Sequence, residues 1–340
     1  MPEKRELGRR PVGRTHIEVS ELGLGGASLA GIFTAVPDQQ ARDTVEAALR
    51  SGISYFDTAP QYGLGRSEHM VGDALRGKRT GTVLSTKVGR LLKPCFDPSE
   101  QGVAWGNPFP FKQVYDYSHD AIMRSFEDSL QRLGLNRVDM LYVHDIGTMT
   151  HGDDNDAHWK ALSESGYKAL DRLRAEGTVG AIGLGVNEWE VLMDAFEIGD
   201  WDVHLLAGRY TLLEQAALSP FMETCLKKDV SIVIGGPYNS GILVGGSTWN
   251  YAKAPPEIVE RVARLENVCR DHGIPLPAAA LQFPLTHPAV ASVIPGPRSP
   301  EELAQTLEWW DTPIAESFWR DLAEAGLLAP GTPLPGGGTA

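Results

Sequence analysis

Residues 83–88 (Val-Leu-Ser-Thr-Lys-Val) and 140–144 (Met-Leu-Tyr-Val-His) are short apolar runs of the kind that form buried strands. Runs of similar length and composition recur at 22–26, 54–58, 181–186, 203–207, 231–235 and 291–295. Between them lie segments with helical spacing, which begin at start signals such as Asp38, Ser118 and Ser299. Eight apolar strands that alternate with helices predict a parallel sheet covered by helices and closed into a (β/α)8 barrel.

Two connections between the expected strands are too long for ordinary loops. One spans residues 91–117 and carries several aromatic side chains, including Trp105; the other spans 145–158 and is acidic. Both leave the carboxyl ends of strands, the face on which barrel enzymes carry their active sites. Residues 11–20 predict a small hairpin across the opposite face, and residues 315–325 predict an extra helix. We therefore expect one barrel domain over residues 1–328, including an N-terminal extension, and a flexible Pro/Gly-rich tail over 329–340.

The composition excludes several classes of partner. Of the 340 residues, 44 are acidic and 31 basic, which gives a net charge of −13 and argues against nucleic acid or an anionic membrane as a partner. Cys95, Cys225 and Cys269 form no C-x-x-C pair, so neither a disulfide framework nor a zinc site is indicated. With a charged N-terminus and no apolar run long enough to span a bilayer, we expect a cytoplasmic protein. The oligomeric state stays open.

Four side chains are expected to meet at one end of the barrel. Asp57, Lys87 and His144 stand at or next to the carboxyl ends of three consecutive strands, and Tyr62 follows Asp57 by five residues. A buried lysine needs a counter-ion, which Asp57 supplies, and the charge of Lys87 is expected to lower the pKa of Tyr62. Singly, the Asp–Lys pair or the histidine has an ordinary structural explanation. Together at strand ends they predict an acid–base site.

Three strings of sequence carry a family resemblance: Phe-Asp-Thr-Ala-Pro-Gln-Tyr-Gly (56–63), Leu-Ser-Thr-Lys-Val-Gly (84–89) and Asp-Met-Leu-Tyr-Val-His (139–144). They resemble the aldo-keto reductase superfamily, and the resemblance runs from about residue 19 to residue 307. It implies a (β/α)8-barrel oxidoreductase that passes a hydride to or from a nicotinamide ring. It further implies that Tyr62 is the general acid/base, that Lys87 and Asp57 tune it, and that His144 orients the substrate.

The glycine-rich pieces 23–26 and 183–185 lack the full G-x-G-x-x-G pattern, so a Rossmann domain is not indicated. The resemblance instead places Asn187 on the nicotinamide carboxamide, although a helix-capping role explains it as well. Gly235 and Gly236, with Ser240 as a donor, are candidates for contact with the pyrophosphate, or they form a simple turn. The tyrosine that the family stacks on the nicotinamide at the end of the seventh strand is missing from Ile234-Gly235-Gly236-Pro237.

The segment after the eighth strand bears on the choice of cofactor. Gly296 and Glu302 stand where NADP-using relatives place a lysine and an arginine. A carboxylate repels a 2′-phosphate and can accept from ribose hydroxyls, so NAD is favoured over NADP. Arg298 works against this preference, and Glu302 also fits a capping box with Ser299.

Further phrases at 143–147, 207–215, 236–241 and 281–285 resemble the NAD-dependent aldose 1-dehydrogenase branch, which includes L-fucose, D-threo-aldose and L-galactose dehydrogenases, with pyridoxal 4-dehydrogenase close by. We therefore expect oxidation of the anomeric carbon of a free aldose to a lactone, with Tyr62 as base, His144 on the substrate and Trp105 over the sugar. Pyridoxal as the substrate of the same site, and a cofactor-binding subunit without catalysis, are the alternatives. The acidic stretch 151–158 lacks the spacing of a metal site and is expected to be a solvated loop; no metal is expected.

Overall fold

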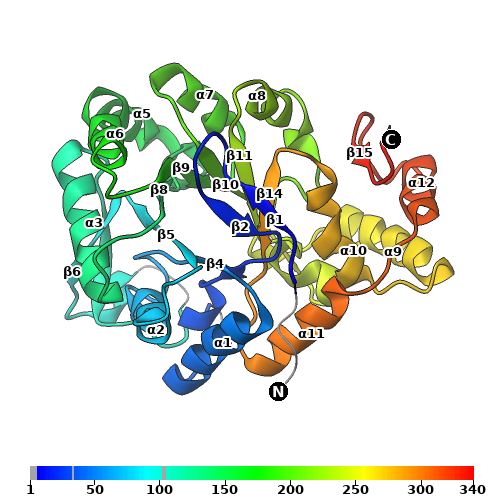
Figure 1. The fold of residues 1–340 in the computed structure, drawn as a ribbon, viewed down its shortest axis with the longest axis horizontal. Helices are drawn as coiled ribbons and strands as arrows, with labels where there is room; N and C mark the ends of the chain where they lie inside the picture. Colours follow the sequence, from blue (N-terminus) through cyan, green and yellow to red (C-terminus); the bar gives the residue numbers. More distant parts are fainter. Residues whose placement is uncertain (1–5, 33, 102–104) are drawn as a thin grey trace.

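The computed structural model describes residues 6–32, 34–101 and 105–340, so parts of the expected N-terminal extension and of the first long connection lie outside the described residues (Figure 1). Its central element is a sheet of eight strands in the order β14-β11-β10-β9-β8-β5-β4-β3. The strands are β3 (Leu24–Gly25), β4 (Tyr55–Asp57), β5 (Val83–Val88), β8 (Met140–His144), β9 (Ala181–Val186), β10 (Val203–Ala207), β11 (Ser231–Gly235) and β14 (Val290–Ile294).

The sheet closes on itself. Every pair of neighbouring strands is parallel. Leu22 forms a parallel bridge with Val293, and the Gly23 N–H donates to the Val293 carbonyl at 2.9 Å, which joins the first strand to the last. The predicted barrel is confirmed, and five of its strands have the expected bounds, whereas β3 and β4 are shorter and β14 begins one residue earlier.

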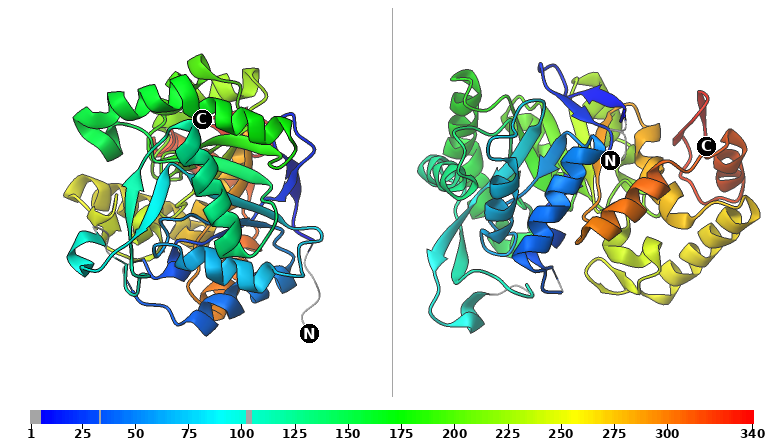
Figure 2. Two further views of the ribbon diagram at one scale, coloured as in Figure 1. Left: turned by 90° about the vertical axis from the view of Figure 1, so that its left-hand side faces the viewer. Right: turned by 60° about the horizontal axis from the view of Figure 1, so that its bottom comes forward.

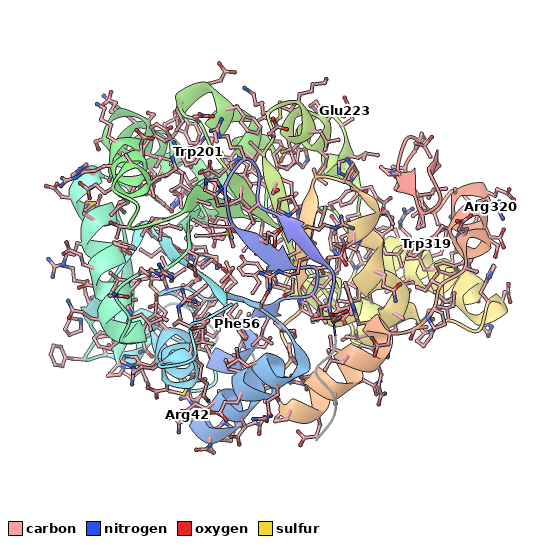
Figure 3. All side chains as sticks on the ribbon, in the orientation of Figure 1. Arg42, Phe56, Trp201, Glu223, Trp319 and Arg320 are labelled. Atoms are coloured by element: carbon pink, nitrogen blue, oxygen red, sulfur yellow. The ribbon has the colours of Figure 1, made fainter. Side chains whose placement is uncertain are left out.

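Helices surround the strands, as Figure 1 shows. They are α1 (Asp38–Ser51), α2 (Arg66–Leu75), α3 (His119–Leu133), α6 (Tyr167–Ala175), α7 (Glu190–Ile198), α8 (Phe221–Lys227), α9 (Pro256–Asp271), α10 (Leu276–Gln282), α11 (Pro300–Trp310) and the expected extra helix α12 (Glu316–Glu324). The main hydrophobic core lies between the helices and the sheet. Phe56 and Trp201 are buried and lie inside the ring of helices, whereas Glu223 is exposed and lies at the edge of the ring (Figure 3). No helix within the described ranges is long and apolar enough to cross a membrane.

A hairpin plugs the amino-terminal end of the barrel, as the sequence predicts. Strand β1 (Arg9–Pro11) pairs with β2 (Glu18–Ser20) in antiparallel register. Val12 and Val19 are fully buried and belong to a second core cluster with residues from the starts of the barrel strands, such as Met140 and Val203. The carboxyl end of the barrel is therefore the end left open for a site.

Both long connections contain regular secondary structure, where loops were expected. The first forms an antiparallel arm of β6 (Arg90–Pro94) and β7 (Phe111–Tyr115), which extends from the end of the barrel opposite the hairpin plug (Figure 2). The second is helical, with α4 (Thr148–His151), a short turn at Gly152–Asp154 and α5 (Asn155–Ala161). Within 151–158, where a solvated loop was expected, the backbone is helical, and the aspartates Asp153, Asp154 and Asp156 are exposed, as expected. His151 and His158 turn inward and stack on each other with ring centroids 4.1 Å apart.

Residues 329–340 form a hairpin in this structure, where the composition predicts an unpacked tail. Strands β15 (Pro333–Leu334) and β16 (Gly338–Thr339) pair beside α12 (Figure 1). Gly336 and Gly337 have φ angles of 90° and 92°, so the glycines that suggest disorder instead supply the left-handed turn that the hairpin needs. Leu334 and Ala340 then pack against the core.

Candidate active site

A cavity of about 390 Å³ opens at the carboxyl ends of β5, β8, β9 and β10. This volume lies in the range of small-molecule sites. Its wall combines apolar and aromatic surface with a few polar groups, and it is formed by Ala27, Ile32, Gln61, Tyr62, Lys87, Trp105, His144, Asp145, Gly185, Val186, Asn187, Leu205, Ala207 and Tyr251. Three of the four expected acid–base residues are in this wall, and the fourth, Asp57, lies directly behind it.

The ion pair of Asp57 and Lys87 forms the base of the site. The side chains are 2% and 1% exposed, and Lys87 Nζ donates to Asp57 Oδ2 at 2.6 Å and to the Thr58 carbonyl at 2.9 Å. Ser85 Oγ donates to the other carboxylate oxygen at 2.6 Å. Burial raises the pKa of Asp57, and Lys87 and Ser85 act in the opposite direction. Burial likewise lowers the pKa of Lys87, against the effect of Asp57.

Tyr62 lies beside this pair, in the turn that follows β4. Its ring centroid is 4.7 Å from Lys87 Nζ, 5.8 Å from the His144 ring and 6.1 Å from the Trp105 ring. The structure thus brings the four residues and Trp105 together. The expected lowering of the Tyr62 pKa by Lys87 is not found: burial, followed by the charges of Asp57 and Asp145, raises this pKa well above its ordinary value. The physical reason is that Asp57 neutralises Lys87, whose ammonium group faces the ring of Tyr62.

His144 ends β8 and is held as a neutral imidazole. Burial, assisted by the charges of Arg90 and Lys87, lowers its pKa well below the usual value. Its Nε2 lies 3.5 Å from Asp145 Oδ2, and its backbone carbonyl accepts a hydrogen bond from the Tyr117 hydroxyl at 2.8 Å. The Nδ1 atom is buried without a partner among the described residues. A neutral imidazole at this position can both accept and donate a hydrogen bond.

Three residues of the site were missed by the reasoning from sequence. Arg90, at the start of the β6–β7 arm, is ion-paired with Asp145, and Gln113 accepts from its other nitrogen at 2.9 Å. Tyr251 comes from the hairpin of β12 (Thr248–Trp249) and β13 (Ala252–Lys253) and reaches the cavity wall. Asp145 directly follows His144 at a strand end, which was an available signal; nothing local marks Arg90 or Tyr251.

Of the residues expected to hold a nicotinamide and a pyrophosphate, one lies in the cavity wall and the others lie outside it. Asn187 is in the cavity wall, where its amide contacts the Ala207 carbonyl at 3.3 Å. Gly235 and Gly236 lie beside this wall rather than in it. Gly236 has a φ of 56°, and a Cβ there would meet only the Gly208 nitrogen, at 3.7 Å, so bare backbone borders open space. Ser240 accepts the backbone N–H of Tyr251 at 3.1 Å and so holds the β12–β13 hairpin.

Gly296, Arg298 and Glu302 follow β14, beside the glycines after β11. Arg298 Nη2 donates to Glu302 Oε1 at 2.6 Å, and its backbone N–H donates to Oε2 at 2.8 Å. Burial would raise the pKa of Glu302, but these contacts with Arg298 outweigh it and lower the pKa. Ser299 Oγ caps the helix by accepting the Glu302 N–H at 3.2 Å, as expected, although the Glu302 carboxylate returns to Arg298 and not to Ser299.

These features fit a nicotinamide cofactor. An amide side chain lies in the same wall as Tyr62 and Lys87, and Gly236, directly after β11, leaves backbone exposed where a diphosphate could approach closely. A phenol beside a buried Lys–Asp pair at the mouth of a barrel is typical of enzymes that move a proton at a substrate oxygen.

A sequence profile of the Aldo/keto reductase family matches residues 21–326. The chain belongs to this family and is an oxidoreductase. It is 46% identical to a pyridoxal 4-dehydrogenase of Microbacterium luteolum over 94% of this chain and 98% of that protein. It is 38% identical to a D-threo-aldose 1-dehydrogenase of a Pseudomonas species, over 92% and 95% of the two chains. Among solved structures, an aldo-keto reductase from Bacillus halodurans superposes with a TM-score of 0.73 at 24% identity, covering 95% of this chain and 97% of its own.

Proposed function

We propose that this protein is an NAD-dependent dehydrogenase that oxidises the hydroxyl-bearing carbon of a small cyclic hemiacetal to a lactone. The observation that carries the proposal is the position of Tyr62, whose ring lies 4.7 Å from the Lys87 ammonium and edge-on to a neutral His144, in the wall of a cavity large enough for a monosaccharide or a pyridine ring.

In this mechanism the substrate hydroxyl points at Tyr62 and His144. The phenolate form of Tyr62 takes the hydroxyl proton as the C–O bond becomes a carbonyl, and neutral His144 holds the same oxygen by a hydrogen bond. Asn187 and the exposed backbone at Gly236 would hold an oxidised nicotinamide cofactor, which would supply the acceptor for the hydride on the substrate carbon. Lys87, fixed by Asp57, lies over the Tyr62 ring, and Trp105 and Tyr251 add aromatic surface to the cavity wall.

Two substrates share the required chemistry. A free aldose closes to a ring hemiacetal at its anomeric carbon, and pyridoxal closes to one through its neighbouring hydroxymethyl group. The reasoning from sequence placed the aldose first and pyridoxal second. The identities of 46% with a pyridoxal 4-dehydrogenase and 38% with an aldose dehydrogenase favour the reverse order, and three aromatic residues of the cavity wall suit a flat pyridine ring.

The preference for NAD rests on Glu302. The carboxylate engages Arg298, which leaves that guanidinium already paired where a 2′-phosphate would need it. Gly296 supplies no cation in place of the lysine of NADP-using relatives. A cytoplasmic location remains part of the proposal; Cys95, Cys225 and Cys269 are all free thiols, as a reducing compartment requires.

The test follows the absorbance of reduced nicotinamide while the purified protein meets NAD or NADP with pyridoxal, L-fucose, D-arabinose, L-galactose and L-xylose. We expect turnover with NAD and with pyridoxal or one of the sugars. Tyr62→Phe should abolish turnover and retain cofactor binding, and Tyr210→Phe, which alters a buried tyrosine outside the cavity, should leave turnover unchanged. Cofactor binding without turnover on any substrate would instead support the non-catalytic subunit.

A further inference from the structure

Asp145 is the charged group that the cavity presents most openly. Lys87 and Asp145 are the charged residues in its wall among those the structure describes. The Lys87 side chain is 1% exposed and donates hydrogen bonds to Asp57 and Thr58, whereas the Asp145 side chain is 19% exposed. A molecule in the cavity therefore meets the carboxylate of Asp145 before it meets the ammonium group of Lys87.

One oxygen of the Asp145 carboxylate is held by neighbouring side chains. Its Oδ2 atom pairs with Arg90, whose own side chain is 2% exposed, and the same oxygen lies 3.5 Å from His144 Nε2. No described residue donates a hydrogen bond to Oδ1. Asp145 also has a φ of 44°, in the left-handed region that aspartate and asparagine enter more often than other non-glycine residues.

We propose that Asp145 is a substrate-binding and specificity residue, which accepts a hydrogen bond from a second hydroxyl of the substrate and disfavours substrates that carry an acid group. This inference rests on the proposed function and names the class of substrate: a neutral polyhydroxy compound. A carboxylate is a strong acceptor for a hydroxyl in a site shielded from water. It repels a carboxylate or phosphate group brought within a few ångströms.

The competing explanation is that Asp145 acts only by neutralising Arg90. The two explanations differ in what happens when both charges are removed together. If Asp145 serves only Arg90, a variant without either charge regains the wild-type kinetics. If Asp145 contacts the substrate, the loss persists because the acceptor is still missing.

The experiment compares Asp145→Asn, Arg90→Gln/Asp145→Asn and the matched control Asp139→Asn. Asp139 directly precedes β8, whereas Asp145 directly follows it. Asp139 pairs with Arg79 at 2.5 Å, and its side chain is 18% exposed, close to the value for Asp145. KM and kcat are measured with the neutral substrate of the wild type. Galacturonic acid and pyridoxal phosphate serve as acidic competitors, and fluorescence quenching checks cofactor binding.

We expect Asp145→Asn to raise KM about ten- to a hundredfold, the loss typical of a hydrogen bond to a charged acceptor, with a much smaller change in kcat. The acidic competitors should bind at least about tenfold more tightly relative to the neutral substrate. The double variant should keep both changes, and Asp139→Asn should show neither.

Recovery of wild-type KM in the double variant overturns the inference, as does an unchanged KM and selectivity in Asp145→Asn. Wild-type turnover is measured first. Its absence on every substrate counts against the proposed function and this inference together, whereas wild-type turnover with an unaffected Asp145→Asn variant counts against this inference alone.

Discussion

Replacing Lys87 by methionine removes one member of a buried ion pair and leaves Asp57 with a single hydrogen bond, from Ser85. Loss of one partner of such a pair costs about 3–5 kcal/mol of folding free energy when the remaining charge stays ionised. The Asp57 carboxylate has an alternative, because it can take up a proton. The penalty is then limited by the free energy of protonating an ordinary carboxyl at the pH of the experiment.

This limit depends on pH. Holding a carboxyl of unfolded pKa about 3.9 in its neutral form costs about 4 kcal/mol at pH 7 and about 1.5 kcal/mol at pH 5. In Lys87→Met the folded pKa of Asp57 is raised above the unfolded value, so stability falls as pH rises through the interval between the two. We therefore expect the variant to lose about 3–4 kcal/mol at pH 7 and at least about 2 kcal/mol less at pH 5.

The measurement is the free energy of unfolding in urea at both pH values for wild type, Lys87→Met and Asp57→Asn/Lys87→Met. The double variant carries neither charge of the ion pair, so its difference from wild type should hardly change between the two pH values. Lys78→Met is the control: Lys78 pairs with Glu46 at a similar distance, 2.9 Å, but in solvent, and its loss should cost less than about 1 kcal/mol. An equal loss at pH 5 and pH 7 in Lys87→Met would refute the reasoning.

Two further predictions concern activity. Because burial raises the pKa of Tyr62, kcat/KM for oxidation should rise with pH between about pH 7 and pH 10. Because burial lowers the pKa of His144, its titration should cause no change in kcat/KM above about pH 6. A flat profile between about pH 7 and pH 10 would contradict this prediction. Gly296→Lys/Glu302→Arg should shift the ratio of kcat/KM for NAD and NADP at least about tenfold toward NADP, and an unchanged ratio would remove the argument from Glu302.

The convergence of Asp57, Lys87 and His144 could be predicted because the barrel leaves their positions little freedom. Strands β4, β5 and β8 are neighbours in the sheet, so side chains at their carboxyl ends must converge once the strands are recognised. Periodicity and length identify those strands from local sequence. The pKa of Tyr62 could not be predicted in the same way, since it depends on burial and on which atoms of Lys87 and Tyr62 face each other.

The rest of the cavity wall comes from contacts between segments far apart in sequence. Arg90 meets Asp145 across 55 positions, through an arm whose strands carry no clear alternation of polar and apolar residues. Tyr251 reaches the wall because its hairpin is tied to Ser240, and both residues have left-handed backbone angles that no local composition requires. Such contacts depend on how the loops pack on the barrel, which local sequence does not predict. Asp145 is the exception, because it directly follows a strand whose end can be predicted.

The glycines of Gly183-Leu184-Gly185 show how one pattern can exclude a fold and also support the site. They do not open a helix as a phosphate-binding loop does; they lie within β9, inside the barrel. A Cβ at Gly183 would fall 1.5 Å from the Val203 carbonyl, and one at Gly185 would lie 3.3 Å from Lys87 Cε. Glycine at 183 lets β9 approach the neighbouring strand, and glycine at 185 leaves room for the lysine chain on its way to Asp57. Gly185 therefore supports the Asp57–Lys87 pair by having no side chain of its own.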